Sequence, residues 1–298
     1  MKILVFIKEG RDVSVPLVYD EHSRGVRKEG GVPQLDPSDC ATLETALKIK
    51  ALFSETHISL IHFGPASGEE WLRQGLSLGC DDVLRIWEHG LDEVHSPGKA
   101  LILARVAEIL GFDLILTGSR SRDTGSGQVG IRMAVHLNIP SVVSVIELAM
   151  DRSDRSARLK KNLARGFQEE VRCPLPLLAT VEGSGDVKRY ASLPDILGAW
   201  EKEISCWDLA QIGLPWESIR EKDSLLNFGP ISFPKPRLKK ISAPESSLPT
   251  FERILKLLEG KIRQREGKII KDDEDHMVEE LFQALLKGGW LKPLQPLS

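Results

Sequence analysis

One stretch, residues 113–137, constrains the fold of this chain more than any other. It reads DLILTGSRSRDTGSGQVGIRMAVHL: an apolar run ends in Thr117-Gly118, a polar glycine-rich loop follows, and apolar residues then recur at Val129, Met133 and Leu137. Because the last spacing is that of one helix face, the pattern predicts a strand, a loop and a helix in succession.

The loop in this stretch is suited to a phosphate group. A helix start leaves backbone N–H groups unpaired at the positive end of the helix dipole, and glycines let a ligand approach closely. The spacing matches neither the Walker pattern nor the dinucleotide-binding glycine pattern, so a loop that only turns the chain is an equally good interpretation. The predicted cradle is Gly125, Ser126, Gly127, Gln128 and Gly130.

Strands and single helices alternate through the first half of the chain, which predicts right-handed crossovers and a parallel sheet. The fold class is therefore α/β, a Rossmann-like parallel sheet with helices on both faces. Ligands bind at the carboxyl ends of such strands, so the loops after Phe6, Phe63 and Leu116 should converge on one crevice. The pattern predicts strands at 2–7, 57–63, 82–86 and 114–116, and helices at about 37–52, 69–78, 96–110 and 129–137.

The chain divides into three parts by pattern. Residues 1–186 form the nucleotide-binding α/β domain, including a hairpin around Arg165-Gly166 that caps the sheet's edge. Residues 187–204 form an apolar loop and a short helix, which either contacts a partner or packs on the protein's own body. Residues 205–298 are rich in proline and predict an extended C-terminal arm with two helices, at about 248–259 and 273–287, that pack on a partner subunit.

Composition excludes several classes of protein. The 298 residues carry a formal net charge of −3 and a pI near 6.2, which argues against a general nucleic-acid binder. No apolar run approaches a membrane span, and the N-terminus resembles a buried strand rather than a signal peptide. Four cysteines are scattered without a C-x-x-C pair, so we expect no metal site and a reducing, cytoplasmic location.

Taken together, the motifs resemble the electron transfer flavoprotein beta subunit over most of residues 1–204. No single motif is specific, but their order and spacing together are. The matching segments are KILVFIK (2–8), DPSD (36–39), GP (64–65), LSLGCD (76–81), DTGSGQVG (123–130) and RYASLP (189–194).

The resemblance implies a heterodimer in which an alpha subunit holds most of the redox-active FAD. The beta subunit would bind AMP, or a second FAD as in electron-bifurcating members, and would shuttle electrons between acyl-CoA-type flavin dehydrogenases and a downstream acceptor. It implies an electron carrier with no catalytic residues of its own. Residues 93–97 lack the Gly-Ala-Asp-Thr pattern of bifurcating members, which favours AMP.

The resemblance also assigns individual residues. Tyr190, Leu193, Pro194 and Ile196 would dock onto a flavin-containing dehydrogenase, with Leu193 at the tip. The nucleotide contacts that it implies are Phe6, Asp36, Pro37, Ser38, Asp39, Phe63, Asp123, Thr124, Gly125, Ser126, Gly127, Gln128, Val129, Gly130 and Ala134.

Two other functions use the same crevice. A stand-alone adenine-nucleotide-binding hydrolase or ligase would need an acid or base, for which Asp123 and His62 are the candidates. A nucleotide sensor without a redox partner would need neither an acid nor a base. The Arg120 and Arg122 pair is suited to a phosphate or a partner's flavin, and equally to an ordinary exposed loop.

Overall fold

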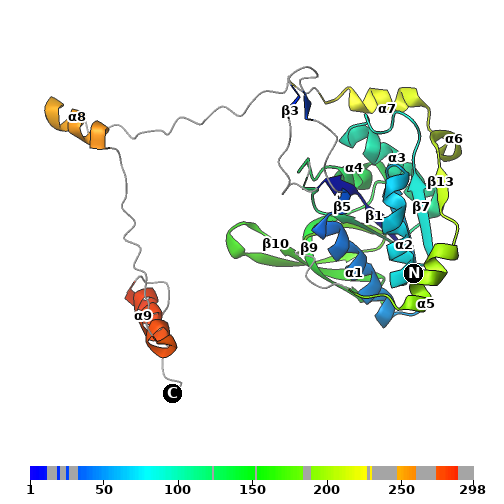
Figure 1. Ribbon diagram of the computed structural model, residues 1–298, viewed down its shortest axis with the longest axis horizontal. Helices are drawn as coiled ribbons and strands as arrows, with labels where there is room; N and C mark the ends of the chain where they lie inside the picture. Colours follow the sequence, from blue (N-terminus) through cyan, green and yellow to red (C-terminus); the bar gives the residue numbers. More distant parts are fainter. Residues whose placement is uncertain are drawn as a thin grey trace. The chain divides into compact units, whose positions relative to one another are not determined.

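The computed structural model describes residues 1–11, 19–20, 25–26, 33–122, 124–151, 153–183, 189–226, 229, 247–259 and 273–287. The chain separates into two units, residues 1–231 and residues 232–298. The first unit contains an α/β sheet, and the described part of the second contains two helices (Figure 1).

The first unit is built on one sheet, which contains nine strands among the described residues. Its order is β11-β10-β9-β12-β8-β1-β6-β7-β13, and neighbours from β9 to β13 in this order run parallel. The predicted α/β class with a parallel sheet is confirmed. Besides β9, the parallel strands are β1 (Lys2–Ile7), β6 (His57–Phe63), β7 (Asp82–Ile86), β8 (Leu114–Gly118), β12 (Leu177–Val181) and β13 (Ser205–Trp207).

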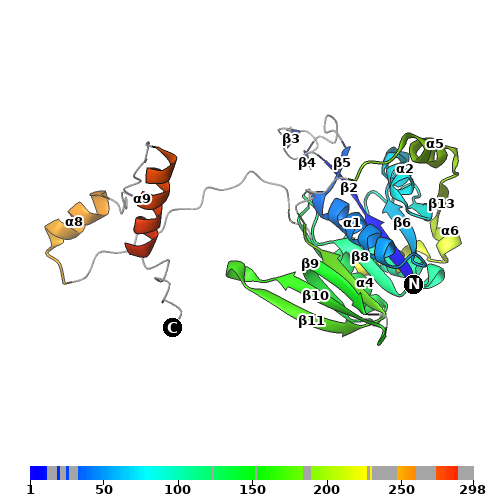
Figure 2. The same ribbon diagram turned by 90° about the horizontal axis from the view of Figure 1, so that it is seen from below.

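The predicted hairpin extends one edge of this sheet. Strands β9 (Ser141–Asp151), β10 (Ser156–Asn162) and β11 (Gln168–Pro174) run side by side there, as Figure 2 shows. Strand β10 pairs antiparallel with both neighbours, and the turn between β10 and β11 is the short helical segment Ala164–Gly166. Two small antiparallel pairs lie outside the main sheet: β2 (Glu9–Arg11) with β5 (Pro33–Leu35), and β3 (Tyr19–Asp20) with β4 (Gly25–Val26).

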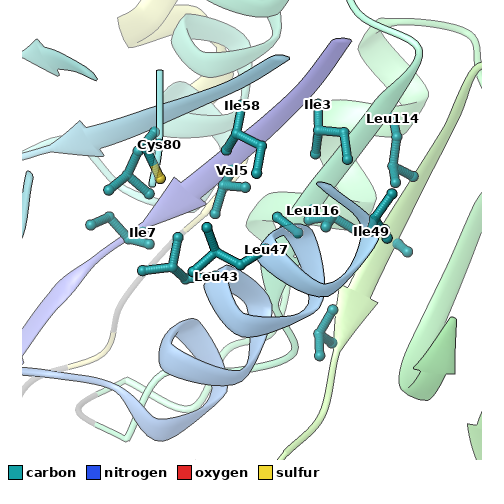
Figure 3. Close-up of a cluster of buried hydrophobic side chains, with 14 of the residues drawn as sticks. Ile3, Val5, Ile7, Leu43, Leu47, Ile49, Ile58, Cys80, Leu114 and Leu116 are labelled. Atoms are coloured by element: carbon teal, nitrogen blue, oxygen red, sulfur yellow. The ribbon is translucent and has the colours of Figure 1, made fainter. Parts of the chain in front are cut away.

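Helices cover both faces of the sheet, each over its own hydrophobic core. Helices α1 (Pro37–Leu52) and α2 (Glu69–Leu78) pack on one face, where Leu43 and Leu47 meet Val5 and Ile58 (Figure 3). Helices α3 (Ser96–Leu110) and α4 (Val129–His136) pack on the other, over Leu4 and its neighbours. Burial of this apolar surface on both faces explains why the central strands are almost continuously apolar.

Local signals set the helix ends. Asp36 caps α1, because its carboxylate accepts a hydrogen bond from the Ser38 backbone N–H at 3.1 Å and Pro37 follows at the first helical position. Gly79 ends α2 at a φ of +114°, a left-handed conformation that favours glycine. A short 3₁₀ turn, Ala66–Gly68, precedes α2.

The structure differs from expectation at residues 205–226, which we predicted to begin the arm. Strand β13 pairs with β7, while α6 (Leu209–Ile212) and α7 (Trp216–Asp223) pack against α3. Buried Leu209, Ile212 and Ile219 supply the contacts. Pro215 immediately precedes α7, so this proline marks a helix start rather than an extended segment.

The second unit contains the two helices that the apolar spacing predicts. Helix α8 (Thr250–Glu259) begins two residues after the predicted start, and α9 spans Glu274–Lys287. Both expose large apolar side chains, among them Phe251 on α8 and Leu281 on α9.

Candidate functional site

A cleft lies at the carboxyl ends of β1, β6 and β8, where the sequence predicts that three loops converge. Seven of the expected nucleotide contacts line it: Phe6, Asp39, Phe63, Ser126, Gly127, Val129 and Gly130. The lining also includes residues that sequence reasoning did not assign to the site: Ile7, Lys8, Lys99, Leu103, Thr117, Gly118, Ser119 and Ser121. Arg120, which we considered as a phosphate or flavin ligand, lines the cleft as well.

The other expected contacts are not part of the cleft lining. Asp36 is buried and accepts a hydrogen bond from the Arg122 backbone N–H at 2.7 Å. Ala134 is 1% exposed within the core under α4. Asp123, also the proposed acid or base, lies outside the described residues. The remaining expected contacts outside the lining are Pro37, Ser38, Thr124, Gly125 and Gln128.

Asp39 joins the loop after β1 to the loop after β8. The buried Asp39 carboxylate accepts hydrogen bonds from the backbone N–H of Lys8, at 2.8 Å, and from that of Gly118. Burial is the largest influence on its ionisation and raises its pKa from 3.8 to about 7, while the two backbone N–H donors oppose the shift. A Cβ on Gly118 would lie 2.2 Å from Asp39 Oδ1, so only glycine fits beside this carboxylate.

The glycine-rich loop reaches α4 through two left-handed residues, Gly125 at a φ of +61° and Gly127 at +57°. Helix α4 then begins without a side-chain cap from its N-cap residue, Gln128. The N–H groups of its first turn have no intrahelical acceptor, and Gln128 supplies none, so they are available to a ligand as far as the described residues are concerned. Gly127, Val129 and Gly130 all line the cleft, so the uncapped start of α4 belongs to its wall.

Charge and aromatic surface complete the cleft. Lys8, Lys99 and Arg120 bring positive charge to the lining, and Asp39 is the one carboxylate among the described residues that line it. The Lys99 ammonium lies 5.4 Å from the centre of the Phe63 ring, a cation–π distance. Such a wall can hold an anionic group and an apolar ring at the same time. Sequence reasoning missed Lys99 because it comes from α3, and no local motif marks its approach to the loop.

His62 is not positioned for acid–base chemistry in this cleft. Its side chain is fully buried, and neither ring nitrogen has a hydrogen-bond partner. Cβ atoms on Gly64 and Gly68 would lie 2.4 Å and 2.0 Å from its ring, so the imidazole fills the space beneath that turn. Burial lowers its pKa to about 4, and the charge of Arg85 adds to the effect. His62 is a neutral packing residue at neutral pH.

The expected docking residues lie on and just before α5 (Leu193–Glu201), which packs on α2. Tyr190 is 91% exposed and Leu193 is 68% exposed; Pro194 and Ile196 are exposed too. The Arg73 guanidinium donates hydrogen bonds to the carbonyls of Ala199, Trp200 and Lys202, at 3.0–3.2 Å, and so holds the end of α5. The helix is anchored on one side and leaves an apolar side uncovered.

In the described part of the chain, no three His, Cys, Asp or Glu side chains form a group that could hold a metal ion. None of its helices combines the length and apolar character that a membrane span requires.

Comparisons with known proteins agree on one family. A family model described as the electron transfer flavoprotein domain matches residues 25–211. The chain is 27% identical to electron transfer flavoprotein subunit beta of Methylophilus methylotrophus, over 91% of this chain and 97% of that protein. It is 28% identical to the protein of the same name from Bacillus subtilis, over 91% and 96%. Caffeyl-CoA reductase-Etf complex subunit CarD of Acetobacterium woodii is 29% identical, over 73% and 82%.

The buried Asp39 predicts a pH-dependent loss of stability. Because its folded-state pKa is raised from 3.8 to about 7, the native chain holds a proton that the unfolded chain releases. The free energy of unfolding should therefore fall as pH rises from about 4 to about 7, by a few kcal/mol at most. Asp39→Asn should remove this component, as measured by urea denaturation at several pH values.

Glu70→Gln is the control for this prediction, because Glu70 is an exposed carboxylate on α2. It should leave the pH dependence of unfolding close to that of the parent chain. The interpretation of Asp39 fails if Asp39→Asn and the parent chain lose stability in parallel over this range.

Proposed function

The chain belongs to the electron transfer flavoprotein family, and from that membership we propose that it serves as the beta subunit of a heterodimeric electron carrier. Members of this family are electron carriers rather than stand-alone enzymes, and this chain is one of them. The observation that carries the proposal is the cleft itself, where a glycine-rich loop, an uncapped helix start and three cations meet at the carboxyl ends of parallel strands.

The proposed ligand of the cleft is an adenine nucleotide, either AMP or a second FAD. Its phosphate would bind at the start of α4, near Gly127 and Gly130, where a helix dipole and free N–H groups favour an anion. Lys8, Lys99 and Arg120 would add attraction. The apolar wall that includes Phe6 and Phe63 suits the adenine ring.

The proposed partners are an alpha subunit that holds the redox-active FAD and a flavin-containing dehydrogenase. The flavin supplies the electron chemistry, while this chain binds the nucleotide and positions the complex. The apolar side of α5 supports a docking role, because a few exposed apolar anchors commonly supply most of the affinity at an interface. Helices α8 and α9 are proposed to pack on the alpha subunit through their exposed apolar side chains.

Copurification tests this function directly. The full chain, produced together with the alpha subunit of its own organism, should yield a yellow complex whose extract contains flavin. Equal amounts of flavin and AMP indicate a simple carrier, whereas flavin alone, at twice the amount, indicates a second FAD in this subunit. A chain that recruits no flavoprotein subunit and hydrolyses ATP by itself would replace the carrier with the hydrolase alternative.

The phosphate position is tested by a pair of variants at Gly127. The two variants, Gly127→Asp and Gly127→Asn, are strained alike, because residue 127 has a positive φ. In both, the new Cβ lies 3.1 Å from the Ser119 carbonyl oxygen. Only the aspartate adds a negative charge, which should weaken AMP binding by roughly tenfold or more relative to the asparagine. Calorimetry on the nucleotide-stripped complex measures both affinities. Equal affinities would place the phosphate elsewhere.

The docking role is tested at Leu193. Leu193→Ala should slow electron transfer from a cognate dehydrogenase on the order of tenfold, because it removes an exposed apolar anchor. Flavin content and melting temperature should not change. Leu52→Ala is the control, since Leu52 on α1 is 78% exposed and outside the proposed interface. A loss of flavin in Leu193→Ala would mean that the loop stabilises the protein instead.

A further inference from the structure

One face of α3 forms a wall of the cleft. Ser96, Lys99 and Leu103 are spaced three and four residues apart, so they lie on the same side of this helix. Lys99 and Leu103 line the cleft, and the Ser96 hydroxyl lies 3.4 Å from that of Ser126 in the glycine-rich loop. The start of this face therefore lies beside the proposed phosphate loop, and Lys99 follows one turn further along.

An aromatic ring helps to fix the position of the Lys99 ammonium. The ammonium lies over the ring of Phe63, 5.4 Å from its centre. Phe63 in turn meets Trp87 in an edge-to-face arrangement, with the ring centres 6.5 Å apart. A lysine side chain has many rotamers, and a cation–π contact restricts them before a ligand binds. Because Phe63 ends β6 and Lys99 belongs to α3, this contact joins two elements of the cleft wall.

The three cations of the cleft differ in their exposure to solvent. Arg120 is exposed, whereas Lys8 and Lys99 are half-buried. Water weakens the attraction between charges, so a half-buried ammonium attracts an anion more strongly than an exposed guanidinium does. Within the described residues, Lys99 is also the lining cation that lies over an aromatic ring. It therefore combines an effective charge with a restricted position.

Building on the nucleotide site proposed above, we propose that Lys99 binds the phosphate of the nucleotide and that Phe63 acts through it, as the positioning residue for its ammonium. The phosphate binds at the glycine-rich loop and the start of α4, and Lys99 donates to it from the α3 wall. The ammonium covers one face of the Phe63 ring, so the adenine rests on the remaining apolar lining, which includes Phe6 and Leu103. The effect of the Phe63 ring on binding then depends on Lys99, whereas a ring that stacked on the base would act independently of it.

A double-mutant cycle separates these two roles of Phe63. AMP affinity is measured by calorimetry on the nucleotide-stripped complex of the full chain with its partner subunit. Lys99→Met should weaken AMP binding roughly tenfold, because it removes a charge-assisted hydrogen bond. Phe63→Leu should weaken binding roughly threefold when Lys99 is present, and should have almost no effect in the Lys99→Met chain. Phe63→Tyr keeps the ring and should bind AMP as the parent chain does.

Lys48→Met is the control, because Lys48 is an exposed lysine on α1 outside the cleft, and it should leave AMP affinity unchanged. The inference is overturned if Phe63→Leu weakens AMP binding by the same factor with and without Lys99, which would place the base on the ring. It is overturned equally if folded Lys99→Met binds AMP as tightly as the parent chain. A parent complex that binds no AMP overturns it too, and one that also holds no second FAD overturns the proposed nucleotide site itself.

Discussion

Two carboxylates at the start of α1 fix the positions of two loops at the cleft. Asp36 accepts a hydrogen bond from the Arg122 backbone N–H, and Asp39 accepts one from the Lys8 backbone N–H. The loops after β8 and β1 are thereby tied to one helix end, where the dipole stabilises negative charge. Burying Asp39 is costly, because desolvation disfavours its charged form. The loops are thus positioned at the expense of some stability, as expected if the proposed binding site limits the choice of residue.

The charge of the Asp39 carboxylate also affects whether the cleft can attract an anion. A buried, fully charged Asp39 would repel a phosphate, but a pKa near 7 leaves the group partly protonated at neutral pH. Lys8, Lys99 and Arg120 then outweigh its remaining charge on the cleft wall. Asp39 accepts its hydrogen bonds from backbone N–H groups, and His62 is fully buried and does not line the cleft. These observations support the proposal that the cleft holds a nucleotide.

Local signals in the sequence were sufficient for most of the fold but not for the whole site. The Asp36-Pro37 start of α1, the Gly79 end of α2 and the alternation of strands and helices each depend on neighbours in the chain. They therefore predicted the elements, the parallel sheet and the converging loops. Lys99 could not be assigned in this way, because its approach to the loop results from packing between distant segments. The proline content of residues 205–226 predicts an arm, whereas their actual structure depends on burying Leu209, Ile212 and Ile219 against a distant helix.

Residues 205–226 complete the α/β unit, although their proline content predicts an extended segment. Strand β13 adds to the edge of the sheet, and α7 packs on α3 through the buried Ile219. The contact brings Asp223 to the N–H groups of His95 and Gly98, which no local side chain satisfies at that helix start. Without this cap, the helix dipole would leave further positive charge beside the glycine-rich loop, because the Ser96 hydroxyl lies 3.4 Å from that of Ser126. The cap at α3 is thus supplied by a distant segment, so two N–H groups at this helix start are paired within the chain, whereas α4 begins without a side-chain cap from its N-cap residue.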